Sequence, residues 1–236
     1  MFDRIAPRYD LCNRLLSFGT DLAWRKKMLR LLPSREKMEL LDLATGTADQ
    51  ALSLVCGDSR FVRATGLDMS ENMLAVGREK ISRLGLTEKI RLRTGDAGAI
   101  PEADSSADVV TISFGIRNVV SVPASLREMF RVLKSGGRVL ILEFSLPENR
   151  AFRPLYLFYL RHILPNLGRA ISGDSSAYRY LNETIETFPC GENFCALMRD
   201  AGFASVKFHP LSLGIATIYQ ADKPESDAGI PARENP

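Results

Sequence analysis

The chain contains 236 residues, 45% of them apolar and 25% charged, a composition that excludes a disordered protein and fits one globular domain. The 31 basic and 28 acidic residues leave a formal net charge of +3 without a long basic run, which argues against nucleic acid as a partner. Four cysteines and two histidines without paired spacing predict neither a metal site nor a disulfide scaffold, and the lack of a signal peptide or of an apolar run of about 18 residues predicts a cytoplasmic protein.

Predicted strands and helices alternate through the first 144 residues. Short apolar runs predict strands over residues 39–44, 61–67, 90–93, 108–114 and 138–144. Apolar residues at helical spacing predict helices over residues 48–56, 70–84 and 123–133, the last ending at residues 134–137. In the second helix, Ser70 is the predicted N-cap, and the predicted buried positions are Met73, Leu74, Ile81 and Leu84. This alternation is typical of right-handed βαβ units, and so of a parallel sheet with helices on both faces.

The alternation stops after residue 144. Residues 150–190 contain seven aromatic side chains but no strand pattern, so we predict a helical insertion there. A helix over residues 192–201 and strands over residues 204–209 and 214–221 follow, which completes an α/β fold in a single domain over residues 1–221. Residues 222–236 are polar and rich in proline and glycine, and we predict a disordered tail.

In an open parallel sheet, ligands bind at the edge where the strands have their carboxyl ends. Residues 42–49, Asp-Leu-Ala-Thr-Gly-Thr-Ala-Asp, follow the first strand, and Gly46 lets the backbone approach a ligand there. This single glycine differs from the G-x-G-x-x-G pattern of dinucleotide enzymes, which argues against a nicotinamide dehydrogenase. An ordinary strand-to-helix turn remains the alternative for Gly46 taken alone.

Acidic residues follow the second and third strands. Asp68 lies 22 residues after Gly46, where a carboxylate reaches the two hydroxyls of a ribose; the alternative is an acid that caps the next helix. Asp96 and Ala97 are placed to meet an adenine amino group, and Ser113 ends the fourth strand beside the central crevice. A nucleoside site without a phosphate-binding loop points to S-adenosylmethionine as the ligand.

The sequence also resembles the ubiquinone/menaquinone biosynthesis C-methyltransferase family, of the UbiE/MenG type, over nearly its whole length. The similar segments are residues 2–26, 41–49, 111–119, 131–137, 143–145, 177–181 and 201–203. Ser-Phe-Gly-Ile-Arg-Asn at 113–118 and Tyr-Arg-Tyr-Leu at 178–181 are the narrowest matches, whereas the glycine turn and Leu-Lys-Ser-Gly-Gly at 133–137 occur in many methyltransferases. The chain departs from the usual pattern at Thr45 and Ala48, where many members have glycine, and at Ser135, where proline is usual.

The resemblance implies a class I S-adenosylmethionine-dependent methyltransferase fold. This fold is a Rossmann-like sheet of seven strands with the last strand antiparallel, and we expect an N-terminal helical lid over residues 1–35 and the insertion on the acceptor side. The cofactor-binding residues that the resemblance implies are Gly46, Thr47, Asp68, Asp96, Ala97 and Ser113. Among them, Thr47 is expected to meet the methionine part of the cofactor and Ser113 the sulfonium end of the crevice.

The resemblance also implies methyl transfer to a ring carbon of a demethylated quinol, such as demethylmenaquinol. A ring carbon becomes nucleophilic when an adjacent hydroxyl loses its proton, so a cation that stabilises the phenolate is useful. We expect Arg117, beside Asn118, to supply that charge; the alternative is an arginine paired with a structural acid. Tyr9 belongs to the predicted lid, and Tyr178 and Tyr180 either line the ring-binding wall or form the aromatic core of the insertion.

The substrate implied by the resemblance is a membrane lipid. Residues 152–167 combine aromatic and basic side chains, so we expect either peripheral contact with the inner face of the membrane or with the isoprenoid tail, or a helix packed on the sheet or in a homodimer. The alternative functions are methylation of the benzoquinol precursor of the ubiquinone pathway, alone or in addition, and a non-catalytic module that keeps the nucleoside pocket.

Overall fold

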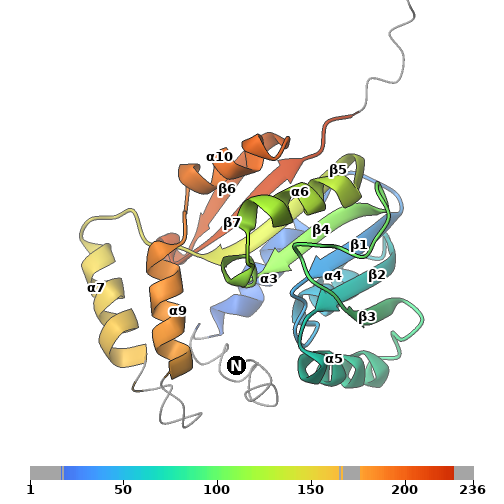
Figure 1. The fold of residues 1–236 in the computed structure, drawn as a ribbon. Helices are drawn as coiled ribbons and strands as arrows, with labels where there is room; N and C mark the ends of the chain where they lie inside the picture. The colour runs from blue at the N-terminus through green and yellow to red at the C-terminus, as the bar shows by residue number, and fades with distance from the viewer. Residues whose placement is uncertain (1–16, 18, 165, 167–175, 226–236) are drawn as a thin grey trace, which may run out of the picture.

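The computed structural model describes residues 17, 19–164, 166 and 176–225, with residues 176–179 described by their backbone. Seven strands form one sheet in the order β3-β2-β1-β4-β5-β7-β6 (Figure 1). The strands are β1 (Met38–Leu43), β2 (Phe61–Asp68), β3 (Ile90–Thr94), β4 (Ala107–Ser113), β5 (Leu133–Phe144), β6 (Ala204–Leu211) and β7 (Ala216–Asp222). Strands β1 to β5 pair in parallel, and β7 is antiparallel to both β5 and β6, which confirms the predicted fold class.

Helices cover both faces of the sheet (Figure 1). One layer holds α3 (Thr20–Leu29), α4 (Asp49–Gly57) and α5 (Glu71–Arg83), and the other holds α6 (Val122–Val132) and α10 (Glu192–Asp200). Neighbouring residues of β4 divide between the layers, because Val109 packs with the first and Val110 with the second. The apolar run of β4 is therefore buried on both faces, as is typical of a central parallel strand.

The predicted insertion is helical where the structure describes it. It contains α7 (Phe152–Phe158), the π-helical turn η3 (Tyr159–Ile163) and α9 (Ser176–Thr187). Tyr156, Leu160, Leu164 and Ile185 form a small core of their own between these elements. In Figure 1, α7 and α9 stand next to each other beyond one end of the sheet.

Three sequence-based boundaries need correction. Leu84 is 57% exposed, because α5 ends at Arg83 and Leu84 is its C-cap. The predicted N-cap Ser70 does accept a hydrogen bond from the Met73 N–H. Residues 134–137 were expected to end a helix, but α6 ends at Val132 and these residues belong to β5. Asp222, the predicted start of the tail, ends β7 and pairs with Arg138 at 2.6 Å, while residues 226–236 lie outside the described residues.

The Gly-Gly pair explains why β5 begins early. Gly136 has a φ of +66°, and a Cβ on Gly137 would lie 2.7 Å from the Lys134 carbonyl oxygen. Glycine thus allows a tight bend inside the strand instead of a helix terminus. The predicted lid is described only in part: α3 lies within it, whereas residues 1–16 and 18 fall outside the described residues.

Candidate active site

The turns that follow β1 and β4 meet at the carboxyl edge of the sheet. Ala44, Ala48 and Phe114 have left-handed φ angles of +45°, +65° and +59°, as does Gly46 at +56°. Such a conformation costs a non-glycine residue about 1–2 kcal/mol, and strained backbone of this kind clusters at functional sites. The two turns pack closely, since a Cβ on Gly115 would lie 2.5 Å from the Cβ of Ala44.

Asp68, the last residue of β2, joins two of these backbone segments. Its Oδ2 accepts a hydrogen bond from the Gly46 N–H at 2.8 Å, and its Oδ1 accepts one from the Ser70 N–H at 2.8 Å. The alternative for Asp68 was an acid that caps the next helix. The side chain that caps α5 is that of Ser70. The carboxylate is instead fixed in orientation at the mouth of the crevice.

A cavity of about 270 Å³ runs along this edge of the sheet. Of the predicted cofactor residues, those that line it are Gly46, Asp68, Asp96, Ala97 and Ser113. Asp96 accepts a hydrogen bond from the Gly98 N–H at 2.8 Å, which orders the loop after β3. The structure therefore brings five of the six predicted residues around one space.

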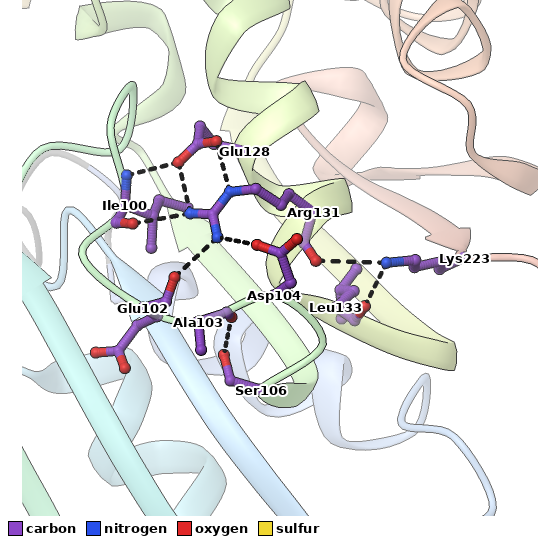
Figure 2. Close-up of polar contacts among 9 residues, drawn as sticks. All are labelled: Ile100, Glu102, Ala103, Asp104, Ser106, Glu128, Arg131, Leu133 and Lys223. Carbon is purple, nitrogen blue, oxygen red and sulfur yellow. Dashed lines mark hydrogen bonds and ion pairs between the residues drawn. The ribbon is translucent and has the colours of Figure 1, made fainter.

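Arg131 on α6 holds the far half of the loop that carries Asp96 and Ala97 (Figure 2). Its guanidinium donates to the carbonyl oxygens of Ile100 at 2.9 Å and Glu102 at 2.8 Å. Glu128 pairs with the same guanidinium at 2.8 Å and accepts the Ile100 N–H at 2.8 Å, and the hydrogen bond from Arg131 lowers the pKa of the Glu128 carboxyl. Three hydrogen bonds thus tie the loop to α6. The Ile100 N–H donates one of them, and the carbonyl oxygens of Ile100 and Glu102 accept the other two.

Thr47, the sixth predicted residue, lies in a smaller adjoining hollow lined by Arg25, Asp42, Ala44, Thr45, Gly46, Thr47, Asp49, Gln50 and Ser113. The Lys80 ammonium donates to Thr47 Oγ1 at 2.9 Å and pairs with Asp49 at 2.7 Å. A Cβ on Gly77 would lie 3.2 Å from the Thr47 carbonyl carbon, so glycine allows α5 to pack against the turn. The hollow and the larger cavity share the walls formed by Ala44, Gly46 and Ser113.

Asp42 is absent from the predicted site residues although it lies at the base of this hollow. Its carboxyl accepts hydrogen bonds from the hydroxyls of Thr45 at 2.6 Å and Thr111 at 2.5 Å. Burial raises the pKa of Asp42 to about 6, against the opposing effect of the two hydroxyls. Thr45, which replaces the glycine usual at this position, therefore has a structural partner.

Arg25 and Gln50 are also missing from the prediction. Gln50 on α4 accepts hydrogen bonds at Oε1 from Ser113 Oγ at 3.2 Å and from Arg25 Nη1 at 3.4 Å. The Arg25 guanidinium lies 5.5 Å from the centroid of the Phe114 ring. Arg25 belongs to a segment that resembles the family, but spacing along the chain does not indicate that α3 and α4 bring these two side chains together.

Arg117 pairs with a buried acid, as in the alternative expectation for this residue. It forms an ion pair with Glu143, and the two side chains are 8% and 1% exposed. It also donates to the Phe114 carbonyl oxygen at 2.8 Å and lies 5.5 Å from the centroid of the Phe144 ring. Burial raises the pKa of Glu143, while the Arg117 charge acts against that rise.

Asn118 lines the larger cavity and accepts a hydrogen bond at Oδ1 from the Tyr180 hydroxyl at 3.2 Å. This contact links η2 (Ile116–Asn118) to α9 of the insertion. Tyr178 belongs to α9, where its backbone alone is described, and Tyr9 lies outside the described residues. Of the four predicted catalytic residues, the structure thus describes the side-chain contacts of Arg117 and Asn118.

A second cavity, of about 310 Å³, lies between α3 and the insertion. Its walls are almost entirely apolar and include Trp24, Phe144, Phe152, Tyr156, Tyr159, Leu160, Leu181 and Ile185. Burial raises the pKa of the Tyr156 hydroxyl, so that group stays protonated. The rings of Phe114 and Phe144, whose centroids are 4.5 Å apart, separate the two cavities, because Phe114 lines the first and Phe144 the second.

The sheet order, the antiparallel β7 and the crevice at the ends of β1 to β4 define the class I methyltransferase architecture. Two solved structures share this fold at 19% identity. One is a chain of the complex between the Haloferax volcanii Trm112 methyltransferase activator and a putative methyltransferase, with a TM-score of 0.69 over 95% of this chain and 98% of that one. The other is a putative S-adenosyl-L-methionine-dependent methyltransferase from Methanococcus maripaludis, with a TM-score of 0.68 over 97% of each chain.

The chain belongs to the ubiE/COQ5 methyltransferase family, whose model matches residues 1–223, and this confirms the resemblance found in the sequence. It is 45% identical over 224 residues to the demethylmenaquinone methyltransferase of Thermus thermophilus, covering 95% of this chain and 100% of the relative. It is 44% identical over 223 residues to the ubiquinone/menaquinone biosynthesis C-methyltransferase UbiE of Geotalea daltonii, covering 94% of each. Within the residues that the structure describes, no helix is both long and apolar enough to cross a bilayer.

Proposed function

We propose that this protein transfers a methyl group from S-adenosylmethionine to a ring carbon of a demethylated quinol, with demethylmenaquinol as the first candidate. The observation that carries the proposal is the pair of adjoining cavities, one rimmed by carboxylates and one walled by aromatic side chains. A nucleoside suits the first, and an aromatic ring with an apolar chain suits the second. Relatives that share 41–45% identity and carry the name demethylmenaquinone methyltransferase support the choice of acceptor.

The cofactor would lie along the ends of β1 to β4. Asp68, already oriented by two backbone N–H groups, would accept hydrogen bonds from the ribose hydroxyls, because each carboxylate oxygen has more than one lone pair. Asp96 and the backbone of Ala97 would meet the adenine. Gly46 and Thr47 would face the methionine part. Ser113, which lines both the small hollow and the larger cavity, would then lie beside the sulfonium.

When bound, S-adenosylmethionine supplies a methyl group already activated by positive sulfur, so the protein has mainly to align the reacting atoms. The acceptor must be the reduced quinol, because loss of a hydroxyl proton makes the neighbouring ring carbon nucleophilic. Arg117 lines neither cavity, but it contacts both Phe114 and Phe144, with Glu143 as its counter-ion, and from there it would stabilise the negative charge that develops on that oxygen. Asn118 would position the ring together with Tyr180, while the lid role of Tyr9 and the wall role of Tyr178 stay predictions.

The test is turnover of the purified protein with radiolabelled S-adenosylmethionine and three acceptors. These acceptors are demethylmenaquinol, the benzoquinol precursor of the ubiquinone pathway and an unrelated phenol, each kept reduced. We expect label in the first at the highest kcat/KM and none in the phenol. Binding of the donor without transfer to any acceptor would instead establish the non-catalytic module, and preference for the benzoquinol would move the enzyme to the other pathway.

We also propose that the outer face of α7 and η3 contacts the membrane in which a polyprenyl quinol resides. Phe158 and Ile163 are exposed there, and Leu155, which is exposed as well, lines the second cavity. Basic Arg153 is close to them along the chain, which suits an anionic membrane surface, whereas Arg161 pairs with Glu186 at 2.5 Å. The protein should float with liposomes that contain anionic lipid, and a Phe158→Glu variant should float less. Absence of flotation, with a dimer in size-exclusion chromatography that Phe158→Glu dissociates, would assign this face to a homodimer instead.

A further inference from the structure

Two buried nitrogen groups in the small hollow lack hydrogen-bond partners. The Arg25 side chain comes from α3 and the Gln50 side chain from α4, and the two residues are 7% and 2% exposed. Neither Arg25 Nε nor Gln50 Nε2 has a partner. The single hydrogen bond between the two residues, from Arg25 Nη1 to Gln50 Oε1, is long at 3.4 Å. A planar cation is therefore buried with its Nε–H donor unused.

Burial of a cation is unfavourable unless an anion compensates for the lost water. Among the described residues, no carboxylate forms an ion pair with Arg25. Asp42 lines the same hollow, and the Arg25 charge acts to lower its pKa, but its carboxyl oxygens are engaged by Thr45 and Thr111. Asp49 pairs with Lys80. The arrangement of this part of the chain thus suits an anion that arrives with a ligand.

The position of the hollow indicates which ligand group arrives there. It shares Gly46 and Ser113 with the larger cavity, whose far end holds Asp96 and Ala97. A nucleoside with its base at that far end and its ribose at Asp68 directs its 5′ substituent toward the hollow. The hollow measures about 20 Å³, which is room for a group the size of a carboxylate and not for a ring.

We propose that Arg25 and Gln50 bind the α-carboxylate of the methionine part of S-adenosylmethionine, an inference that rests on the proposed function. The planar guanidinium matches the two oxygens of a carboxylate, and the free Gln50 Nε2 adds a donor beside them. Because Arg25 comes from α3, the bound cofactor ties this N-terminal helix to the sheet.

The test compares ligands that differ in this carboxylate. S-adenosylhomocysteine carries it, and 5′-methylthioadenosine has the same nucleoside without the amino-acid group. We expect Arg25→Met to weaken S-adenosylhomocysteine binding by about 10- to 100-fold in calorimetry, the range for a hydrogen bond to a charged group, and to leave 5′-methylthioadenosine binding unchanged. The wild-type protein should also bind decarboxylated S-adenosylmethionine weakly, because this ligand lacks the carboxylate; its affinity should be as low as that of the Arg25→Met variant for S-adenosylhomocysteine.

Two further variants separate binding from folding. Lys26→Met removes an exposed charge from the same helix and should change neither affinity. Gln50→Glu places a carboxylate beside Arg25, so the fold is retained while S-adenosylhomocysteine binding falls and 5′-methylthioadenosine binding does not. Without ligand, Arg25→Met should melt close to the wild-type temperature, because the buried charge forms no ion pair and its contacts with Gln50 and Phe114 only partly offset the loss of water.

The outcomes distinguish this contact from the function on which it rests. An equal loss of affinity for both nucleosides in Arg25→Met, or a lowered melting temperature without ligand, would give Arg25 a purely structural role and overturn the inference. Equal binding of both nucleosides by all variants would overturn it as well. A wild-type protein that binds neither nucleoside would refute the cofactor assignment itself, and the carboxylate contact with it.

Discussion

Replacing Gly115 by alanine should separate the two turns that form the floor of the larger cavity. The added Cβ would lie 2.5 Å from the Cβ of Ala44, whereas carbon atoms in contact prefer about 3.5–4.0 Å, so the turns must move apart by about 1 Å. Gly115 has a φ of −113°, which alanine adopts without strain, so the effect is one of contact alone. Overpacking of this kind costs about 1–3 kcal/mol.

The assay is calorimetric titration with S-adenosylhomocysteine together with thermal unfolding. We expect Gly115→Ala to weaken binding about 10-fold or more and to lower the melting temperature. Gly98→Ala is the matched control, because a Cβ there would meet Asp96 Oδ1 at an ordinary 3.5 Å. The double variant Ala44→Gly with Gly115→Ala moves the methyl group from one turn to the other and should restore most of the affinity. Normal binding by Gly115→Ala, or no rescue in the double variant, would refute the close packing of these turns as the cause.

Four other predictions follow from single contacts. Asp68→Asn should weaken S-adenosylhomocysteine and 5′-methylthioadenosine alike by about 10-fold or more in calorimetry, since both ligands carry the ribose; loss of one alone would contradict the ribose contact. Asp42 has a folded-state pKa of about 6, above the ordinary 3.8, so it favours folding below pH 3.8 and loses that contribution as pH rises through 6. The unfolding free energy of wild type relative to Asp42→Asn should therefore fall by about 3 kcal/mol between pH 3.5 and 7 in urea titrations, and a flat difference would exclude the raised pKa. Arg131→Lys should raise the KM for S-adenosylmethionine several-fold with little change in kcat, because one ammonium cannot hold both loop carbonyls; an unchanged KM would show that the loop needs no such anchor. Arg117→Met should abolish methyl transfer and also destabilise the protein by about 3–5 kcal/mol by leaving Glu143 unpaired, whereas Arg117→Met with Glu143→Leu should recover stability without activity; recovered activity in that pair would refute a role for the Arg117 charge.

The strands of this fold are predictable because buried strands have continuous runs of apolar residues in the sequence. The run over β4 is buried on both faces, and the carboxyl ends of β1 to β4 must then share one edge, which brings Gly46, Asp68 and Ser113 together. Leu84 fits the helical period but follows the last turn of α5, and periodicity alone does not mark that end. Gly136 and Gly137 have the composition of a helix stop, yet they bend a strand, because the left-handed φ of Gly136 suits either structure.

The site is less predictable where contacts cross between layers. Arg117 lies in η2, which follows β4, and Glu143 lies near the end of the neighbouring β5. Both belong to segments that resemble the family, but neither segment indicates that the two side chains form an ion pair. Arg25 and Gln50 meet because α3 lies against α4, a packing that depends on tertiary structure. The sequence around Asp42 is that of an ordinary strand. Its raised pKa arises from burial of the carboxyl in the folded protein, which the sequence does not indicate.

The ring pair of Phe114 and Phe144 has a consequence for how substrate choice can change. Phe144 is the last residue of β5, and Phe114 directly follows the last residue of the adjacent β4, so the ring pair between the two cavities is anchored to two hydrogen-bonded strands. The position of the pair is therefore set largely by the sheet, whose strands lie about 4.8 Å apart. Under the proposed function, substitutions in α7 and α9 can therefore reshape the apolar cavity for other head groups or chains without moving this ring pair, beside which the methyl donor and the ring carbon must come into direct contact.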